Sequence, residues 1–291
     1  IISYQTFSRN LPQVQNMELF PWLKTLYEIW KHVDEDVVCY SALTGMGELL
    51  ETGCTTCLDH HYVFPGQPGT GCWTPSSGQQ MPWESVSHAT RGSMDLSVKD
   101  GGLPPDSVVQ TVDQILKDSE RAVKKFHDKS RYSMHQVALA PCSPFSVTGT
   151  LLKESAQLAR ELGVRITPIW LRQRTRNGQQ RSVSGCGPGV HGEPGMDGGG
   201  CVVCPWNPFT EDELKRLAET GTGVAHCPIS NMKLSSGVAL VPKMLELGVP
   251  LGLAVDGSAS NDGSNLWRRC GWPICFTGSG GAGRRRLLMT S

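Results

Sequence analysis

Residues 223–257 read GVAHCPISNMKLSSGVALVPKMLELGVPLGLAVDG, and this stretch decides the fold. It has a short, mostly apolar run at each end, GVAHCP at 223–228 and PLGLAVDG at 250–257, with a helical pattern at 239–247 between them. Two such runs joined by a helix are typical of a parallel β-α-β unit. The stretch therefore predicts a parallel sheet with helices packed against it.

The same alternation extends toward the amino terminus. Further strand-like runs are CTTCLDHHYVF at 54–64, HQVALAP at 135–141 and GVRI at 163–166. Helical patterns are predicted along one face at Leu19, Leu23, Leu26 and Trp30, and then over 36–51, 105–127, 149–162 and 210–219, the last opening with a capping-box pattern. Strand–helix alternation predicts either an α/β barrel or a doubly wound sheet. No glycine-rich phosphate loop follows the first strands, which disfavours the dinucleotide-binding sheet.

Composition excludes several classes of protein. The 291 residues carry 27 basic and 27 acidic side chains, so neither a nucleic-acid-binding basic protein nor an acidic disordered chain is expected. There is no run of about 18 apolar residues that would span a membrane. The start, IISYQTFSRNLPQ, lacks a signal-peptide pattern and a Met. We therefore expect a soluble cytoplasmic protein, cut short at both ends, whose 11 Cys form no disulfide framework. A homo-oligomer stays possible.

Polar side chains gather where the predicted strands end. They are Asp59 and His60, Cys142 and Ser143, His226, and Asp256. A (β/α)8 barrel places its chemistry at the carboxyl ends of its strands, which favours the barrel over the open sheet.

Six segments resemble the amidohydrolase superfamily, in its branch of 8-oxoguanine deaminases and hydroxytriazine aminohydrolases. They are SYQTFSRNLP, GCTTCLDHHYVFP, HATRGSMDLSVKDGGLPPDSV, LAPCSPFSV, TGVAHCPISNMKLSSGVA and VDGSASNDGSN, in the order of the family. The resemblance implies a TIM-type barrel with one zinc ion, held by an HxH pair on the first strand, a His on the fifth and an Asp on the eighth. Zinc would supply hydroxide at neutral pH, and a nearby carboxylate would accept the proton of the water.

The resemblance also implies roles for individual residues. Asp256 would be the zinc ligand and the catalytic proton acceptor, the alternative being an Asp that caps a turn before Gly257. Substrate-binding residues would be Cys142, Gln5, Ser260, His226 and Arg91. Four of them have a structural alternative: a small buried Cys for Cys142, a polar loop residue for Gln5, a satisfied structural His for His226 and an ion-paired Arg for Arg91. Of His60 and His61, at most one could face a site, since neighbours on a strand point to opposite sides.

The sequence departs from the family where the zinc ligands belong. Ile1 and Ile2 stand where the HxH strand should end, and residues 166–173 read ITPIWLRQ instead of a string such as IHTHLAET. One added base after the codon for Ile166 restores IHTHLAET, and residues 201–208 contain VWFAHGI one base along. Residues 72–88 read as an amphipathic helix leading into a strand in a neighbouring frame, and the tail after Leu266 reads as helical. We therefore predict single-base frameshifts.

These observations predict an incomplete TIM-type (β/α)8 barrel of the metal-dependent amidohydrolase kind over 1–266, out of frame at 71–87 and 167–208, with an out-of-frame tail at 267–291. The predicted activity is zinc-dependent hydrolytic deamination of a purine-like ring, favoured to be 8-oxoguanine, with a hydroxytriazine as the alternative. A second hypothesis is an inactive fragment, because the HxH and HTH ligands are missing. A zinc ribbon of Cys54, Cys57, Cys201 and Cys204 is disfavoured because the two pairs lie far apart in the sequence.

Overall fold

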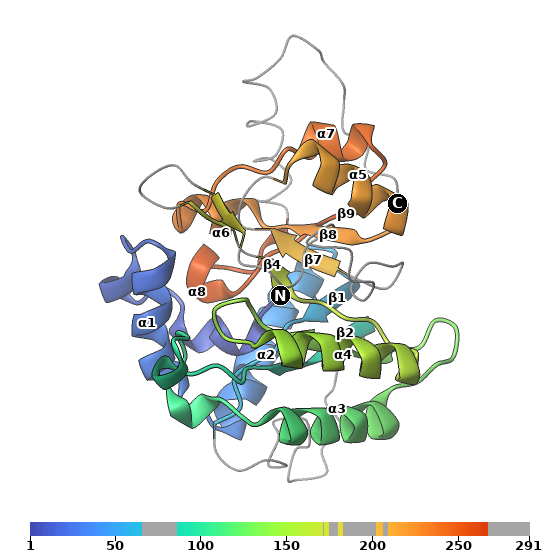
Figure 1. The fold of residues 1–291 in the computed structure, drawn as a ribbon. Helices are drawn as coiled ribbons and strands as arrows, with labels where there is room; N and C mark the ends of the chain where they lie inside the picture. The colour runs from blue at the N-terminus through green and yellow to red at the C-terminus, as the bar shows by residue number, and fades with distance from the viewer. Residues whose placement is uncertain (66–85, 171, 175–179, 183–201, 206–208, 267–291) are drawn as a thin grey trace.

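The computed structural model describes residues 1–65, 86–170, 172–174, 180–182, 202–205 and 209–266 (Figure 1). Most of the predicted out-of-frame segments, 71–87 and 167–208, and the whole tail 267–291 lie outside these residues. The strands are β1 Thr56–Asp59, β2 Val86–Ser93, β3 His135–Pro141, β4 Ile169–Trp170, β5 Arg172–Arg174, β6 Gln180–Ser182, β7 Val202–Pro205, β8 Gly223–His226 and β9 Leu251–Leu253.

The main strands form two parallel sheets. The first has the order β1-β2-β3, and the second has the order β4-β7-β8-β9. β5 and β6 form a separate antiparallel pair. Parallel neighbours of this kind require crossover connections, and helices occupy those connections along most of the chain.

Two isolated parallel bridges join the two sheets into a ring. At the first, Leu139 of β3 forms a parallel bridge with Ile166, just before β4. At the second, Ile2 forms a parallel bridge with Gly257, just after β9. The amino group of Ile1 donates to the carbonyl of Leu58 at 2.8 Å, so the start of the chain also lies against β1.

The ring has the topology of a (β/α)8 barrel with three reduced positions. The first strand is represented by Ile1 and Ile2, and the fifth by Ile166 with the two-residue β4. The sixth is β7, which follows a long segment outside the described residues. The predicted α/β class and incomplete barrel are thus confirmed, and the first and fifth strands are the most reduced.

Helices cover the outside of the ring, as Figure 1 shows for α3 and α4 beside β2 and β3 and for α5 and α7 beside β8 and β9. The α-helices are α1 Leu19–Trp30, α2 Glu35–Glu51, α3 Val112–Phe126, α4 Gly149–Leu162, α5 Glu211–Thr220, α6 Pro228–Lys233, α7 Val241–Glu246 and α8 Ser258–Asn261. The 3-10 helices are η1 Ser3–Ser8, η2 Pro12–Val14, η3 Val98–Asp100 and η4 Asp106–Val108. None of the described helices is both long and apolar enough to cross a membrane.

Local capping explains where α3 and α5 begin. The predicted capping box of α5 is present, with the Thr210 and Glu213 side chains each bonded to the other's backbone N–H. The predicted helix over 105–127 was too long, because the chain first makes η4 and the α-helix begins only after Thr111. Thr111 forms a second capping box with Gln114, and that pair was missed.

An aromatic cluster fixes η1 against the helices. The ring of Trp30 lies edge-on to those of Tyr4, Trp22 and Tyr27, at centroid distances of 5.5, 5.5 and 5.7 Å. All four side chains are buried. Edge-to-face aromatic pairs add to the free energy gained by burying their apolar surface. These contacts hold η1, which contains Gln5, against α1.

Candidate active site

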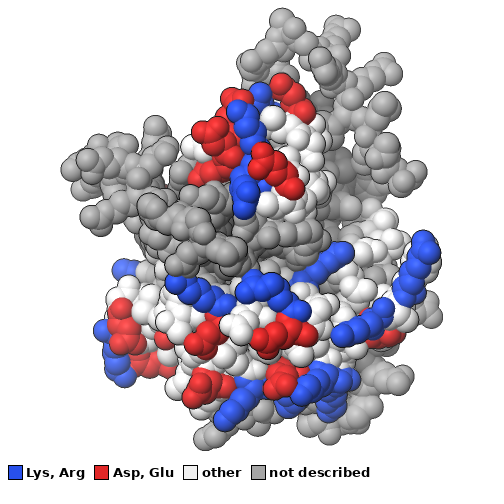
Figure 2. Space-filling view, turned by 45° about the vertical axis from the view of Figure 1, so that its right-hand side comes forward, with Lys and Arg blue, Asp and Glu red and all other residues white. Residues whose placement is uncertain are grey.

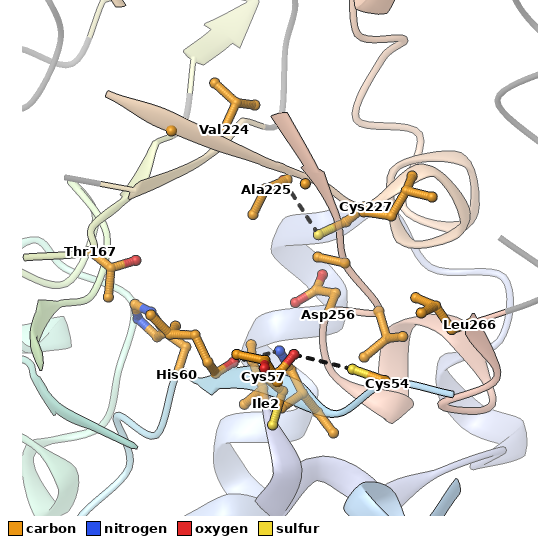
Figure 3. A pocket seen from close by; sticks show the side chains of 18 of the residues that line it. Ile2, Cys54, Cys57, His60, Thr167, Val224, Ala225, Cys227, Asp256 and Leu266 are labelled. Atoms are coloured by element: carbon orange, nitrogen blue, oxygen red, sulfur yellow. Dashed lines mark hydrogen bonds between the residues drawn. The ribbon is translucent and has the colours of Figure 1, made fainter. Parts of the chain in front are cut away.

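A cavity of about 380 Å³ occupies the inside of the ring. β8, β9 and β1 contribute much of its wall, together with Ile1 and Ile2. Figure 3 shows the carboxylate of Asp256 pointing into this space, with His60 and Thr167 on one side and Cys227 on the other. The polar end of the cavity lies beyond the carboxyl ends of β1 and β9, where a barrel carries its functional groups.

Asp256 is held by two serine hydroxyls. Ser230 Oγ donates to Asp256 Oδ2 at 2.5 Å, and Ser260 Oγ donates to the same oxygen at 3.3 Å. Asp256 has a φ of 60°, in the left-handed region that few residues other than glycine adopt. The side chain of Asn261 bonds back to the carbonyls of Val255 and Gly257 and so holds this turn. The carboxylate is therefore fixed in place by α6 and α8.

Gln5 lies beside the same turn. Its Nε2 donates to Tyr62 Oη at 3.3 Å, while its Oε1 is buried without a hydrogen-bond partner among the described residues. The amide packs so tightly on Gly257 that a Cβ there would collide with it. Gln5, Asp256 and Ser260 are thus brought together from the two ends of the described chain.

Cys142 is buried at the carboxyl end of β3, close to the same tyrosine. Burial raises the pKa of its thiol to about 12, although hydrogen bonds with Ser146 and Ser143 oppose the rise. Burial also raises the pKa of Tyr62 well above its usual value, and the nearby Tyr4, Cys142 and Asp256 add to that rise. The thiol is therefore a neutral group near neutral pH.

Seven buried side-chain atoms lack hydrogen-bond partners among the described residues, four of them on Tyr4, Arg9, Trp22 and His61 and three on residues at this end of the barrel. The latter three are Gln5 Oε1, His60 Nε2 and His226 Nδ1. Burial lowers the pKa of His60 to about 3, helped by the ammonium of Ile1 and by His61, and it lowers the pKa of His226 as well. Both imidazoles are neutral near pH 7. A buried polar atom without a partner costs free energy, so such a group of atoms indicates a place for a polar ligand.

His61 and Asp59 hold the segments next to the site in place. His61 packs edge-on against Tyr4 and Phe64, whereas His60 lines the cavity, in agreement with the prediction that at most one of the two faces it. Asp59 Oδ1 accepts from Ser3 N at 2.9 Å, and its Oδ2 accepts from Ser3 Oγ. Asp59 therefore ties η1 to β1.

Arg91 lies elsewhere, on the helix-facing side of β2. Its Nε donates to Asp118 Oδ2 of α3 at 2.7 Å, and Nη2 donates to Gln110 Oε1 at 2.6 Å. Nη1 donates to the carbonyl of Gly92, and the guanidinium lies 4.2 Å from the ring centroid of Phe64. These contacts are those of the structural ion pair that was the alternative interpretation of Arg91.

The described residues do not fit a zinc ion. No group of three or more His, Cys, Asp or Glu side chains that could hold a metal occurs in the part of the chain that the structure describes. The partners of Asp256 there are serine hydroxyls, whereas a catalytic zinc needs about three protein ligands of imidazole, thiolate or carboxylate type. Cys201 of the disfavoured zinc ribbon lies outside the described residues.

Sequence reasoning missed Ser230 and Tyr62 as parts of the site. Ser230 lies within CPISN and Tyr62 within DHHYVF, both of which carry the resemblance, but neither residue type suggested a role by itself. Their roles depend on long-range contacts, from Ser230 to Asp256 and from Tyr62 to Gln5. No signal in the spacing of the sequence reports such contacts.

Comparison with known proteins supports the predicted family. The model of the amidohydrolase family matches residues 197–277. An 8-oxoguanine deaminase of Pseudomonas aeruginosa is 40% identical over 278 residues, covering 90% of this chain and 59% of the relative. The chain is similar to proteins of the amidohydrolase family. It spans less than two thirds of the length of this relative.

A second relative and a solved structure are also similar to this chain. A hydroxydechloroatrazine ethylaminohydrolase of a Pseudomonas strain is 35% identical, with 90% of this chain and 55% of the relative covered. Among solved structures, the zinc complex of an atrazine chlorohydrolase from Arthrobacter aurescens superposes with a TM-score of 0.80 at 23% identity. That alignment covers 91% of this chain and 60% of the other, and it shows the shared fold.

Proposed function

We propose that the protein encoded by the restored reading frame is a hydrolytic deaminase of an amino-substituted purine-like ring, favoured to be 8-oxoguanine. The observation that carries the proposal is the 40% identity with an 8-oxoguanine deaminase over nine tenths of the chain. The geometry supports it with a fixed carboxylate and buried, unpartnered polar atoms at one end of the barrel. The alternative substrate is a hydroxytriazine, which the 35% identical ethylaminohydrolase favours.

The reaction would replace a ring amino group by oxygen. Water adds to the carbon that bears the amino group, Asp256 accepts the proton of the water, and the proton then leaves with the amine as ammonia. Ser230 and Ser260 hold one carboxylate oxygen, so the other is free to take the proton. Gln5 Oε1 would accept a hydrogen bond from a ring N–H, and Nε2 stays on Tyr62. Cys142 would contact the ring as a neutral thiol, and His226 as a neutral imidazole.

No step of this scheme runs through zinc, because the described residues do not hold one. We propose that the zinc-dependent enzyme is the product of the restored reading frame, in which IHTHLAET and VWFAHGI supply the histidines of the fifth and sixth strands, with the HxH pair still to be supplied by the first strand. The chain as it stands would then be inactive, in agreement with the second hypothesis. Resequencing the DNA that encodes residues 160–210 decides between the active enzyme and the inactive chain. An extra base in that DNA favours the active enzyme. An uninterrupted reading frame favours a similar protein that does not catalyse the reaction.

Ammonia release tests the substrate. The frame-restored protein, loaded with zinc, is assayed with 8-oxoguanine and with a hydroxytriazine, beside the chain as it stands. We expect turnover of 8-oxoguanine by the restored protein only, and a loss of about 10²- to 10⁴-fold in kcat for Asp256→Asn. Asp106→Asn, an exposed carboxylate on η4, is the matched control and should keep full activity. Full zinc occupancy with no turnover of either ring would refute the proposal.

A further inference from the structure

The amino end of the barrel, opposite the candidate active site, carries polar side chains on its inner face. Leu58 of β1 lines the cavity, and its partners in register on the next two strands are His88 of β2 and Gln136 of β3. Partners in register point to the same side of a sheet, so His88 and Gln136 face inward. Barrel strands normally carry bulky apolar side chains on this face. Packing alone therefore does not account for these two residues.

Arg165 reaches the same end of the barrel from the segment before β4. Its carbonyl accepts from Leu139 N at 2.9 Å, and Thr167, two residues later, lines the cavity. Alternate residues of an extended segment point to the same side, so Arg165 lies on the inner side as well. Its side chain is exposed, and its guanidinium has no hydrogen bond or ion pair within the described residues.

The loop between α3 and β3 adds two basic residues. His127 Nδ1 accepts a hydrogen bond from Val137 N at 3.0 Å, so the neutral ring carries its proton on Nε2, which remains a donor. Lys129 Nζ lies 3.9 Å from the position that a Cβ on Gly163 would occupy, at the end of α4. Figure 1 shows this loop beside that end of α4. Gly163 is two residues before Arg165, so Lys129 lies close to the segment of Arg165.

The charges around His88 are not balanced. Burial lowers the pKa of His88, and the positive charges of Arg165 and His127 lower it further. Among the described groups that shift this pKa, none is a carboxylate. The acidic residue of the loop, Asp128, interacts with His127, but its two oxygens are bonded to Ser130 N and Oγ at 2.9 Å each. Like charges held together without a counter-ion cost free energy, so the arrangement favours an anion.

We propose that an amino-end cluster of His88, His127, Lys129 and Arg165 binds a tetrahedral oxyanion of the phosphate class. The donors come from a strand, a loop and the segment before β4, and so from several directions, which suits a tetrahedral ion better than a flat carboxylate. The guanidinium would form two parallel hydrogen bonds to it, and the lysine would add a positive charge. This inference does not rest on the proposed deamination, because the cluster lies at the other end of the barrel.

Sulfate is the first probe, because its charge does not change near neutral pH. The chain is titrated with sodium sulfate at constant ionic strength, balanced by sodium chloride, and the ring signals of the histidines are followed by NMR. We expect the signals of His88 and His127 to shift saturably, while those of the exposed His32 after α1 stay unchanged.

A charge-matched pair of variants tests the role of the guanidinium. Arg165→Gln should weaken sulfate binding roughly 10-fold, because it removes the bidentate charged donor. Lys24→Gln, which removes one positive charge from an exposed position on α1, is the control and should leave the affinity unchanged. The cluster lies outside the segments that are expected to be out of frame. The titration is therefore run on the chain as it stands and on the frame-restored chain.

Three results would overturn the proposal. The first is the absence of a saturable shift in both chains. The second is an equal shift of His32, or equal weakening by the two variants, which would mean a general response to salt. The third is binding of acetate as tight as that of sulfate. Methyl phosphate and inorganic phosphate then identify the source of the ion. Tighter binding of the ester supports a site for a phosphorylated molecule, and equal binding supports a site for the free ion.

Discussion

Two buried polar clusters lie on opposite sides of the barrel wall, and they differ in how far their hydrogen bonds are satisfied. Around Arg91, the three guanidinium nitrogens donate to Asp118, Gln110 and a backbone carbonyl. Around Asp256, the carboxylate is bonded, but Gln5 Oε1 and His226 Nδ1 nearby have no partner among the described residues. The first cluster joins a strand to a helix, and in the second cluster Asp256 lines the cavity.

The difference separates stability from function. Burying a polar group without a partner costs free energy, so a fold that tolerates several at one place has a use for them. A fully paired cluster needs no ligand and serves to hold the structure together. Changes in the first cluster should therefore lower stability, and changes in the second should lower binding and activity while leaving stability nearly intact.

The largest expected effect is that of Asp118→Ala. Arg91 is fully buried and would lose its carboxylate partner, so we expect the variant to lose about 3–5 kcal/mol of unfolding free energy. Thermal unfolding should show a drop in Tm of roughly 10 °C. Asp113→Ala, an exposed acidic residue at the start of the same helix, is the control and should cost under about 1 kcal/mol. Equal losses in both variants would contradict the assignment of Arg91 to the structural cluster.

Acid should weaken the fold by a comparable amount. Burial lowers the pKa of His60 to about 3 and that of His61 to about 4. At His61, the carboxylate of Asp59 opposes this lowering of the pKa and the guanidinium of Arg91 adds to it. The unfolded chain, whose histidines titrate near 6.5, then binds more protons than the folded one. Stability is therefore fully present above about pH 6.5 and falls as the pH drops toward 4, by up to about 1.4 kcal/mol per pH unit for each His. Urea unfolding at pH 7 and pH 5 measures the slope, which His60→Asn should roughly halve.

Gly257→Ala should affect the site and not the fold. A Cβ at this position would collide with the amide of Gln5, which is the far end of a side chain but would have to give up its hydrogen bond to Tyr62 in order to move. In the frame-restored enzyme we expect kcat/KM to fall roughly 10- to 100-fold, with a stability change below about 1 kcal/mol. Gly149→Ala, with nothing near its Cβ on α4, is the control for both readouts. A large drop in Tm with unchanged activity would place Gly257 in the structural cluster.

The smallest effect should come from an ion pair on the surface of α3. Lys124 Nζ lies 2.6 Å from Glu120 Oε1, a distance close to that of the Arg91–Asp118 pair, but both side chains are exposed. Acidic and basic groups are interspersed on this face of the molecule (Figure 2). Lys124→Ala should therefore change the unfolding free energy by at most about 0.5 kcal/mol. A larger loss, measured by urea unfolding, would mean that the N–O distance, and not burial, determines how much an ion pair contributes to the unfolding free energy.

Some of this architecture was predictable because it depends on neighbours in the chain. The run HQVALAP matches β3 residue for residue, and the helix predicted over 149–162 matches α4. The capping box at Thr210 placed the start of α5. The helix that ends at Phe126 was predicted to begin too early, because apolar periodicity continued through a segment that folds as η4.

The site was predicted only as a set of residue types. The structure groups Asp256, Gln5 and Ser260 and places Cys142 close to them, but their roles stay predictions. Arg91 was grouped with these residues because it lies near the end of a strand. Whether such a side chain points into the barrel or toward a helix depends on the register of the strand, and a shift of one residue reverses it.

The sequence by itself determined the alternation of strands and helices, the cap of α5 at Thr210 and the position of Asp256 near the end of a strand, since these follow from periodicity and from contacts over a few residues. Only the tertiary structure decided that Arg91 pairs with α3 and that Ser230 reaches the carboxylate of Asp256. It also decided that Ile1 and Ile2 join β1 to the end of β9. These contacts link residues far apart in the chain, and they form only when the ring of parallel strands closes and brings its two ends together.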